Sequence, residues 1–172
     1  MKNFLAVIGG IVVALFLLPL LVFSCNMVNS PGALNGFPAS APVSSPSSMS
    51  VTEIADKIKG AMEKSAPGAF RAELDLEHGL FKVDMMNSFT RDDIEAIRSG
   101  IGSEIWGDVQ KQVLDICRDL QGRFNDNGHP EITVVYSLVD PEAPDIAFLT
   151  AAQGVIGYDV VRGIDLLNDH GE

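Results

Sequence analysis

The chain has 172 residues, of which 47% are hydrophobic, and carries 12 Lys and Arg against 23 Asp and Glu, a formal net charge of −11. This apolar content excludes a disordered chain, and the negative charge argues against a nucleic-acid-binding protein. Two cysteines are too few for a disulfide-rich scaffold or a four-thiolate zinc site. The composition therefore predicts one domain of ordinary size with additional segments.

Residues 4–23 form a charge-free apolar run, FLAVIGGIVVALFLLPLLVF. A helix rising about 1.5 Å per residue would span about 30 Å here, the thickness of the bilayer's hydrocarbon core. Every helical face of the run is apolar, which is poorly suited to a helix of a soluble protein. Lys2 favours a cytoplasmic N-terminus. We therefore expect residues 4–23 to enter the cell membrane and the chain after them to be extracytoplasmic.

The end of this run, Val22-Phe23-Ser24-Cys25, resembles the lipobox of bacterial lipoproteins. That family places an aliphatic residue three positions before the cysteine and a small residue just before it, as Val22 and Ser24 do; Phe23 is larger than the usual residue there. The resemblance covers the first 25 residues and implies a cleaved signal peptide with Cys25 as the lipidation site. An uncleaved signal anchor over residues 1–25 is an equal alternative. Cleavage that releases the domain from the membrane ranks below these two interpretations.

Residues 26–50 carry no charge and contain seven serines and four prolines. Such a segment buries too little apolar surface to order itself, so we expect a disordered linker with a reach of about 25–30 Å. Beyond residue 25 the chain has 11 basic and 23 acidic side chains, a net charge of −12, so anionic lipid repels it. The sequence thus predicts a tethered globular domain over residues 51–167, followed by an acidic tail, 168–172.

The globular part opens with a predicted helix over residues 51–64. Ser50 and Glu53 have the spacing of a capping box, and the Ala66-Pro67-Gly68 sequence ends the helix. The apolar stripe of this helix consists of Ile54, Ile58, Ala61 and Met62.

Residues 70–87 alternate between apolar and polar side chains, which predicts a two-stranded hairpin. A two-residue turn at His78-Gly79 would connect the strands. The expected inward pairs are Leu76 with Phe81, Leu74 with Val83, and Ala72 with Met85.

The outer face of this hairpin carries an acidic strip, Glu73, Asp75, Glu77 and Asp84. The expected register sets Asp75 opposite Lys82, a favourable pair, and Glu73 opposite Asp84, an unfavourable one. Such carboxylates suit a hard cation like calcium, but no loop ligands with metal-site spacing accompany them. We therefore interpret the strip as a solvated sheet face and assign no metal site.

Residues 91–124 predict two helices separated by the Ser99-Gly100-Ile101-Gly102-Ser103 break. The first, capped by Thr90 or Ser88, should end near Gly100, and the second should run over residues 103–124. Cys117 lies beside the apolar stripe of the longer helix, as a small buried hydrophobe would.

Residues 132–139 are apolar on both faces and predict a central strand. Residues 146–151 and 155–161 then predict a second hairpin around Gln153-Gly154, with a helix over 145–153 as the alternative. The expected pairs are Ala147 with Val160, Leu149 with Tyr158, and Ala151 with Ile156; Asp159 would face Phe148 on the other side. Residues 163–172 should form at most a short helical turn and then disorder.

The predicted fold is therefore α+β and two-layered, in the order α-β-β-α-β-β-β. We expect an antiparallel sheet of four or five strands with the helices packed on one face.

No sequence motif for phosphate binding, a serine hydrolase or a zinc protease is present. His78, His129 and His170 fall in a turn, a loop and the tail, and the aromatic Trp106, Phe124 and Tyr136 suit core or sheet packing. No catalytic residue or cofactor is predicted. We therefore favour a non-enzymatic module that presents a sheet face or edge strand to another envelope protein.

Two alternatives stay open. One is an envelope hydrolase that uses surface carboxylates such as Glu73 and Asp84, which requires a cleft and raised pKa values. The other is a carrier that holds a small apolar ligand between the long helix and the sheet.

Overall fold

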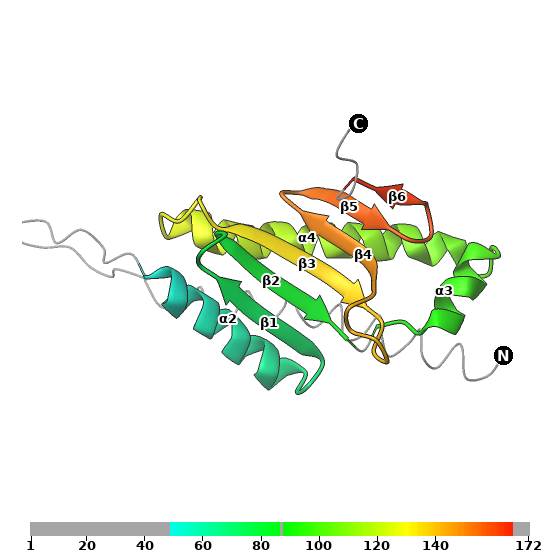
Figure 1. The fold of residues 1–172 in the computed structure, drawn as a ribbon, viewed down its shortest axis with the longest axis horizontal. Coiled ribbons are helices and arrows are strands. Elements are labelled where there is room, and N and C mark those ends of the chain that lie inside the picture. The colour runs from blue at the N-terminus through cyan, green and yellow to red at the C-terminus, as the bar shows by residue number, and fades with distance from the viewer. Residues whose placement is uncertain (1–48, 87, 167–172) are drawn as a thin grey trace, which may run out of the picture.

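A computed structural model of the chain describes residues 49–86 and 88–166. The described residues form three helices and one six-stranded sheet (Figure 1). In chain order these elements are α2 (Val51–Ser65), β1 (Phe70–Asp75), β2 (Leu80–Met85), α3 (Arg91–Arg98), α4 (Ser103–Asp126), β3 (Thr133–Val139), β4 (Ala147–Ala152), β5 (Val155–Asp159) and β6 (Ile164–Asp165). The predicted α+β class is confirmed.

The sheet is mixed, which corrects the expectation of a purely antiparallel sheet of four or five strands. The strands lie side by side in chain order, and β2 and β3 run parallel while every other neighbouring pair is antiparallel. A parallel pair needs a long crossover, and α3 with α4 supplies it between β2 and β3. The sixth strand, β6, occupies residues for which at most a helical turn was predicted, so both the strand count and one strand direction were wrong.

Local signals set the helix starts as predicted, whereas the helix ends differ from the predicted residues by one or two positions. Ser50 caps α2 and forms a reciprocal capping box with Glu53, in which the Ser50 amide donates to the Glu53 carboxylate at 2.8 Å. Thr90 and Asp93 form the same arrangement at α3. The break between α3 and α4 contains Gly100 and Gly102, both with positive φ, a backbone conformation that glycine adopts at little cost.

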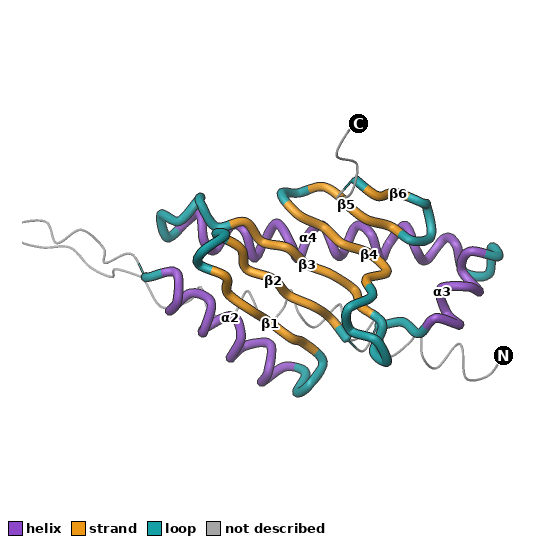
Figure 2. Tube along the Cα trace, in the orientation of Figure 1, coloured by secondary structure: helices purple, strands orange, loops and turns teal. Residues whose placement is uncertain are grey.

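One face of the sheet packs against the helices. The helix α4 lies behind the sheet in Figure 1, and α2 lies alongside β1 (Figure 2). Helix and sheet residues form one core cluster, whose largest members, Trp106, Tyr136, Phe81 and Phe124, are at most 1% exposed. The Phe81 and Phe124 rings lie 5.3 Å apart. The core positions predicted for Trp106, Phe124 and Tyr136 are therefore confirmed.

The first hairpin differs from the expected register by two residues. Leu74 lies opposite Phe81 and Ala72 opposite Val83, because a four-residue connection, residues 76–79, replaces the predicted two-residue turn. Leu76, expected inside, is 62% exposed. A shift of two residues leaves each strand residue on its predicted face, so the inward side of the hairpin still belongs to the core.

The second hairpin begins as predicted and then departs from the expected register. A two-residue turn at Gln153-Gly154 sets Ala151 opposite Ile156, which excludes the helical alternative. The next pairs are Thr150 with Tyr158 and Leu149 with Asp159, because the ladder is irregular at this point and β5 carries one extra residue. This bulge changes the face of the residues beyond it. The predicted Leu149–Tyr158 pair is therefore wrong.

Candidate functional site

The acidic strip predicted on the first hairpin is interleaved with basic groups. Asp84 lies opposite Arg71, whose Nε and Nη2 donate to the same carboxylate oxygen at 2.9 and 2.8 Å. Glu73 lies opposite Lys82. Each of these pairs places opposite charges across from each other, so the expected direct pairing of Glu73 with Asp84 does not occur in this register. Glu73 and Asp84 are diagonal neighbours on this face, and each lies opposite a basic residue.

The remaining members of the strip are Asp75, the last residue of β1, and Glu77, in the connection between β1 and β2. The Asp75 carboxylate accepts hydrogen bonds from the backbone N–H of His78 at 3.0 Å and lies 2.9 Å from its Nδ1. These contacts, the backbone bond first, lower the pKa of Asp75. Glu77 is exposed in the same connection. Within residues 49–86 and 88–166, no group of three or more His, Cys, Asp or Glu side chains is arranged to hold a metal ion.

The face of the sheet away from the helices has two halves. On β1 and β2 it carries the charged pairs described above. On β3, β4 and β5 it is neutral: Val135 pairs with Ala152, Ser137 with Thr150, and Thr150 with Tyr158. The Ser137 and Thr150 hydroxyls lie 3.0 Å apart and satisfy each other. Val155, opposite Ala152 at the end of this half, is 57% exposed. We call the surface formed by Thr133, Val135, Ala152, Val155 and Tyr158 the neutral face.

A carboxylate that sequence analysis did not single out, Asp159, is fully buried beneath the end of β5. Its oxygens accept hydrogen bonds from Trp106 Nε1 at 3.1 and 3.2 Å and from Gln110 Nε2. The backbone N–H groups of Val161 and Arg162 donate to it at 2.9 and 3.0 Å. The Asp159 carboxylate thus accepts hydrogen bonds both from α4 and from the turn after β5, and it connects the two segments. The alternation of the strand predicts the opposite face for Asp159, so no local signal reveals this role.

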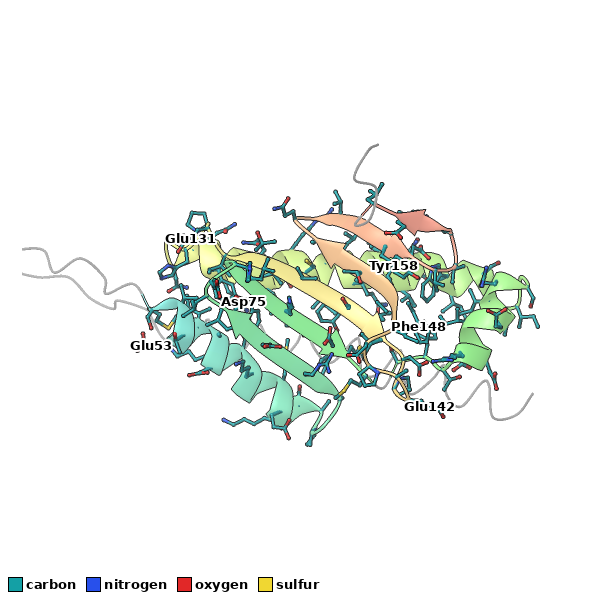
Figure 3. The ribbon with its side chains drawn as sticks, in the orientation of Figure 1. Glu53, Asp75, Glu131, Glu142, Phe148 and Tyr158 are labelled. Carbon is teal, nitrogen blue, oxygen red and sulfur yellow. The ribbon has the colours of Figure 1, made fainter. Side chains whose placement is uncertain are left out.

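A second buried carboxylate, Asp140, follows β3. Its side chain is 2% exposed, and Arg91 at the start of α3 donates to it through Nε. The Arg91 contact lowers the pKa of Asp140, with the Glu142 backbone N–H contributing further. This pair fixes the start of α3 to the loop between β3 and β4. Figure 3 shows Glu142 and Phe148 at this end of the sheet, with Asp75 and Glu131 at the opposite end.

Cys117 is buried, as its position on the long helix predicts. Its thiol lies 3.6 Å from the carbonyl oxygens of Val134 and Ala151, and burial raises its pKa. A thiol with a raised pKa forms little thiolate at neutral pH and is a poor nucleophile. Cys117 is therefore a structural residue of the core.

Several predictions lie outside the described residues: the membrane segment 4–23, the lipidation candidate Cys25, the linker up to residue 48, His170 and the tail 168–172. Among the residues that are described, no helix is both long enough and apolar enough to cross a bilayer.

No protein-family model, curated protein or solved structure matches the chain.

Proposed function

We propose that this protein is a membrane-tethered, extracytoplasmic binding or assembly module of the bacterial cell envelope. The N-terminal run of 20 uncharged residues supports the tether, and the Val22-Phe23-Ser24-Cys25 sequence supports Cys25 as its lipidated end. The Ser/Pro-rich linker would let the acidic domain reach a partner without lying on the lipid.

The observation that carries the binding proposal is the two-sided character of the sheet. Helices cover one side, whereas the neutral face lies on the other and includes the exposed Val155. An uncharged sheet face beside charged pairs suits a protein partner with an apolar centre and a polar rim. The edges suit strand addition less well, because α2 lies along β1 and the other edge is the two-residue β6.

Photo-crosslinking in intact cells tests this proposal. The photoreactive residue p-benzoylphenylalanine would replace Val135 or Val155 on the neutral face, and Asp115 or Asp119 on the exposed side of α4 as matched controls. We expect the same envelope protein to be captured from both neutral-face positions and from neither control, and Val135→Lys to abolish capture at Val155. Equal capture from all four positions, or none from the neutral face, would contradict the proposed binding surface.

Intact-mass analysis of the membrane fraction tests the tether. Loss of residues 1–24 with an acylated Cys25 is the lipoprotein outcome, and an unmodified full-length mass is the signal-anchor outcome. A Cys25→Ala variant should accumulate uncleaved in the first case and behave as wild type in the second. Recovery of the wild-type chain from the soluble fraction would contradict both forms of the tether.

A further inference from the structure

His129 connects the start of the folded domain to the loop between α4 and β3. The helix α4 ends at Asp126, Gly128 follows with φ of +85°, and the His129 backbone N–H donates to the Phe124 carbonyl at 2.9 Å. This glycine-dependent helix ending turns the His129 side chain back toward the first described residue, Met49. Imidazole Nε2 lies 2.9 Å from the Met49 carbonyl oxygen, and Nδ1 lies 3.0 Å from Glu131 Oε1.

Both neighbours of the imidazole are acceptors under ordinary conditions. A backbone carbonyl accepts only, and an ionised carboxylate accepts only, so each contact needs a proton on the ring nitrogen that faces it. The doubly protonated imidazolium satisfies both contacts at once. Neutral imidazole carries one N–H and therefore loses one hydrogen bond, either to Met49 or to Glu131.

The contact between His129 and Met49 holds the chain at the point where it enters the folded domain. Met49 directly precedes Ser50, which caps α2, and stands at the end of the Ser/Pro-rich segment. We propose that His129 is a pH-sensitive clasp, which holds the entry of the chain into the folded domain when protonated and weakens its hold when neutral. The clasp is independent of what the neutral face binds.

The two hydrogen-bond acceptors beside the imidazole favour its protonated form. The Met49 carbonyl raises the pKa of His129 most, Glu131 raises it further, and partial burial opposes them. Other charged groups on neighbouring elements are Lys57 of α2, whose ammonium contacts the Met49 sulfur, Asp75 at the end of β1, and Glu77 and His78 of the β1–β2 connection. The connection reaches this site because the Gly79 carbonyl accepts from Thr133 at 2.8 Å, and Figure 3 shows Asp75 and Glu131 at the same end.

The sign of the effect follows from the raised pKa. A group that binds its proton more tightly in the folded state stabilises that state fully below its unfolded pKa, about 6.5 for histidine. The stabilisation is lost as the pH rises through the higher, folded value. Each unit between the two values corresponds to about a tenfold change in the opening equilibrium.

Hydrogen–deuterium exchange of the full chain in lipid nanodiscs tests the clasp. After correction for the intrinsic pH dependence of exchange, peptides covering residues 49–56 should lose protection in wild type as the pH rises from 6 to 9. His129→Gln, which keeps a neutral donor, should show constant corrected protection over that range. His78→Gln is the matched control and should behave as wild type, because His78 contacts Asp75 of its own turn.

A ¹⁵N-histidine titration of the same sample gives a second readout that does not depend on the variant's folding. We expect the His129 pKa to lie above its value in urea, and Glu131→Gln to move it part of the way back. A folded pKa at or below the value in urea would overturn the proposal, as would a His129→Gln chain that loses protection with pH as wild type does.

Discussion

The two hairpins are built from similar alternating sequences, yet they use their outward carboxylates in opposite ways. In the hairpin of β1 and β2, Asp84 stays on the outer face and pairs with Arg71. In the hairpin of β4 and β5, the bulge turns Asp159 inward, where Trp106 and Gln110 bind it. The first hairpin has a turn two residues longer than predicted, and this shift of two leaves each strand residue on its predicted face. In the second hairpin one extra residue in β5 moves the following residues to the opposite face.

The largest expected loss of stability comes from removing Asp159, the buried carboxylate of the second hairpin. Asp159→Ala leaves the Trp106 and Gln110 side chains and two backbone N–H groups without their acceptor, which should cost about 3 kcal/mol or more of unfolding free energy. Urea unfolding followed by the fluorescence of Trp106, the single tryptophan, measures it. Asp108→Ala on the exposed side of α4 is the control, expected within about 0.5 kcal/mol of wild type. Equal midpoints for the two variants would contradict the structural role of Asp159.

The turns of the two hairpins should respond unequally to alanine. Gly79 and Gly154 both have positive φ, so either substitution strains the backbone by about 1–2 kcal/mol. At Gly79 a Cβ would also lie 3.0 Å from the Glu131 backbone oxygen, whereas at Gly154 the nearest atom is in the flexible Arg118 side chain at 3.5 Å. Gly79→Ala should therefore be the more destabilising, measured by the same unfolding experiment. Greater destabilisation by Gly154→Ala would mean that the β1–β2 connection is not packed against the residue 131 backbone.

The smallest expected effect is a coupling energy that tests the register of the first hairpin. A double-mutant cycle between Arg71 and Asp84 should give a coupling energy of about 0.5 kcal/mol, since exposed cross-strand ion pairs are weak. The corresponding cycle between Asp75 and Lys82, which the two-residue turn would have paired, should give a smaller one. The opposite ranking would support the register expected from the sequence over the observed one.

Much of the fold could be predicted because its signals are local. The Ser50–Glu53 capping box, the glycine break after α3 and the apolar strand β3 each depend on residues within a few positions of one another. The parallel pairing of β2 with β3 could not be predicted from such local signals. It depends on how two helices return the chain to the same end of the sheet, across more than forty residues.

The candidate sites divide along the same line. The predicted acidic strip exists as a set of neighbouring residues, but its electrostatic character depends on which strand residues face each other, and the observed register supplies Arg71 and Lys82 as partners. The contacts of Asp159, Asp140 and His129 join segments between 49 and 80 residues apart, so the spacing of the sequence carries no trace of them. These contacts depend on how the sheet and the helices pack together.

By itself, the amino-acid sequence determined the α+β class, the positions of the principal helices and strands, and the side of the first hairpin that enters the core. Periodicity and capping are short-range properties, and burial of one face suffices to express them. Tertiary structure alone decided the strand directions, the bulge that buries Asp159 and the return of His129 to Met49. Those features balance packing and hydrogen bonding between distant segments, and a single extra residue in a strand is enough to redirect a charge from solvent into the core.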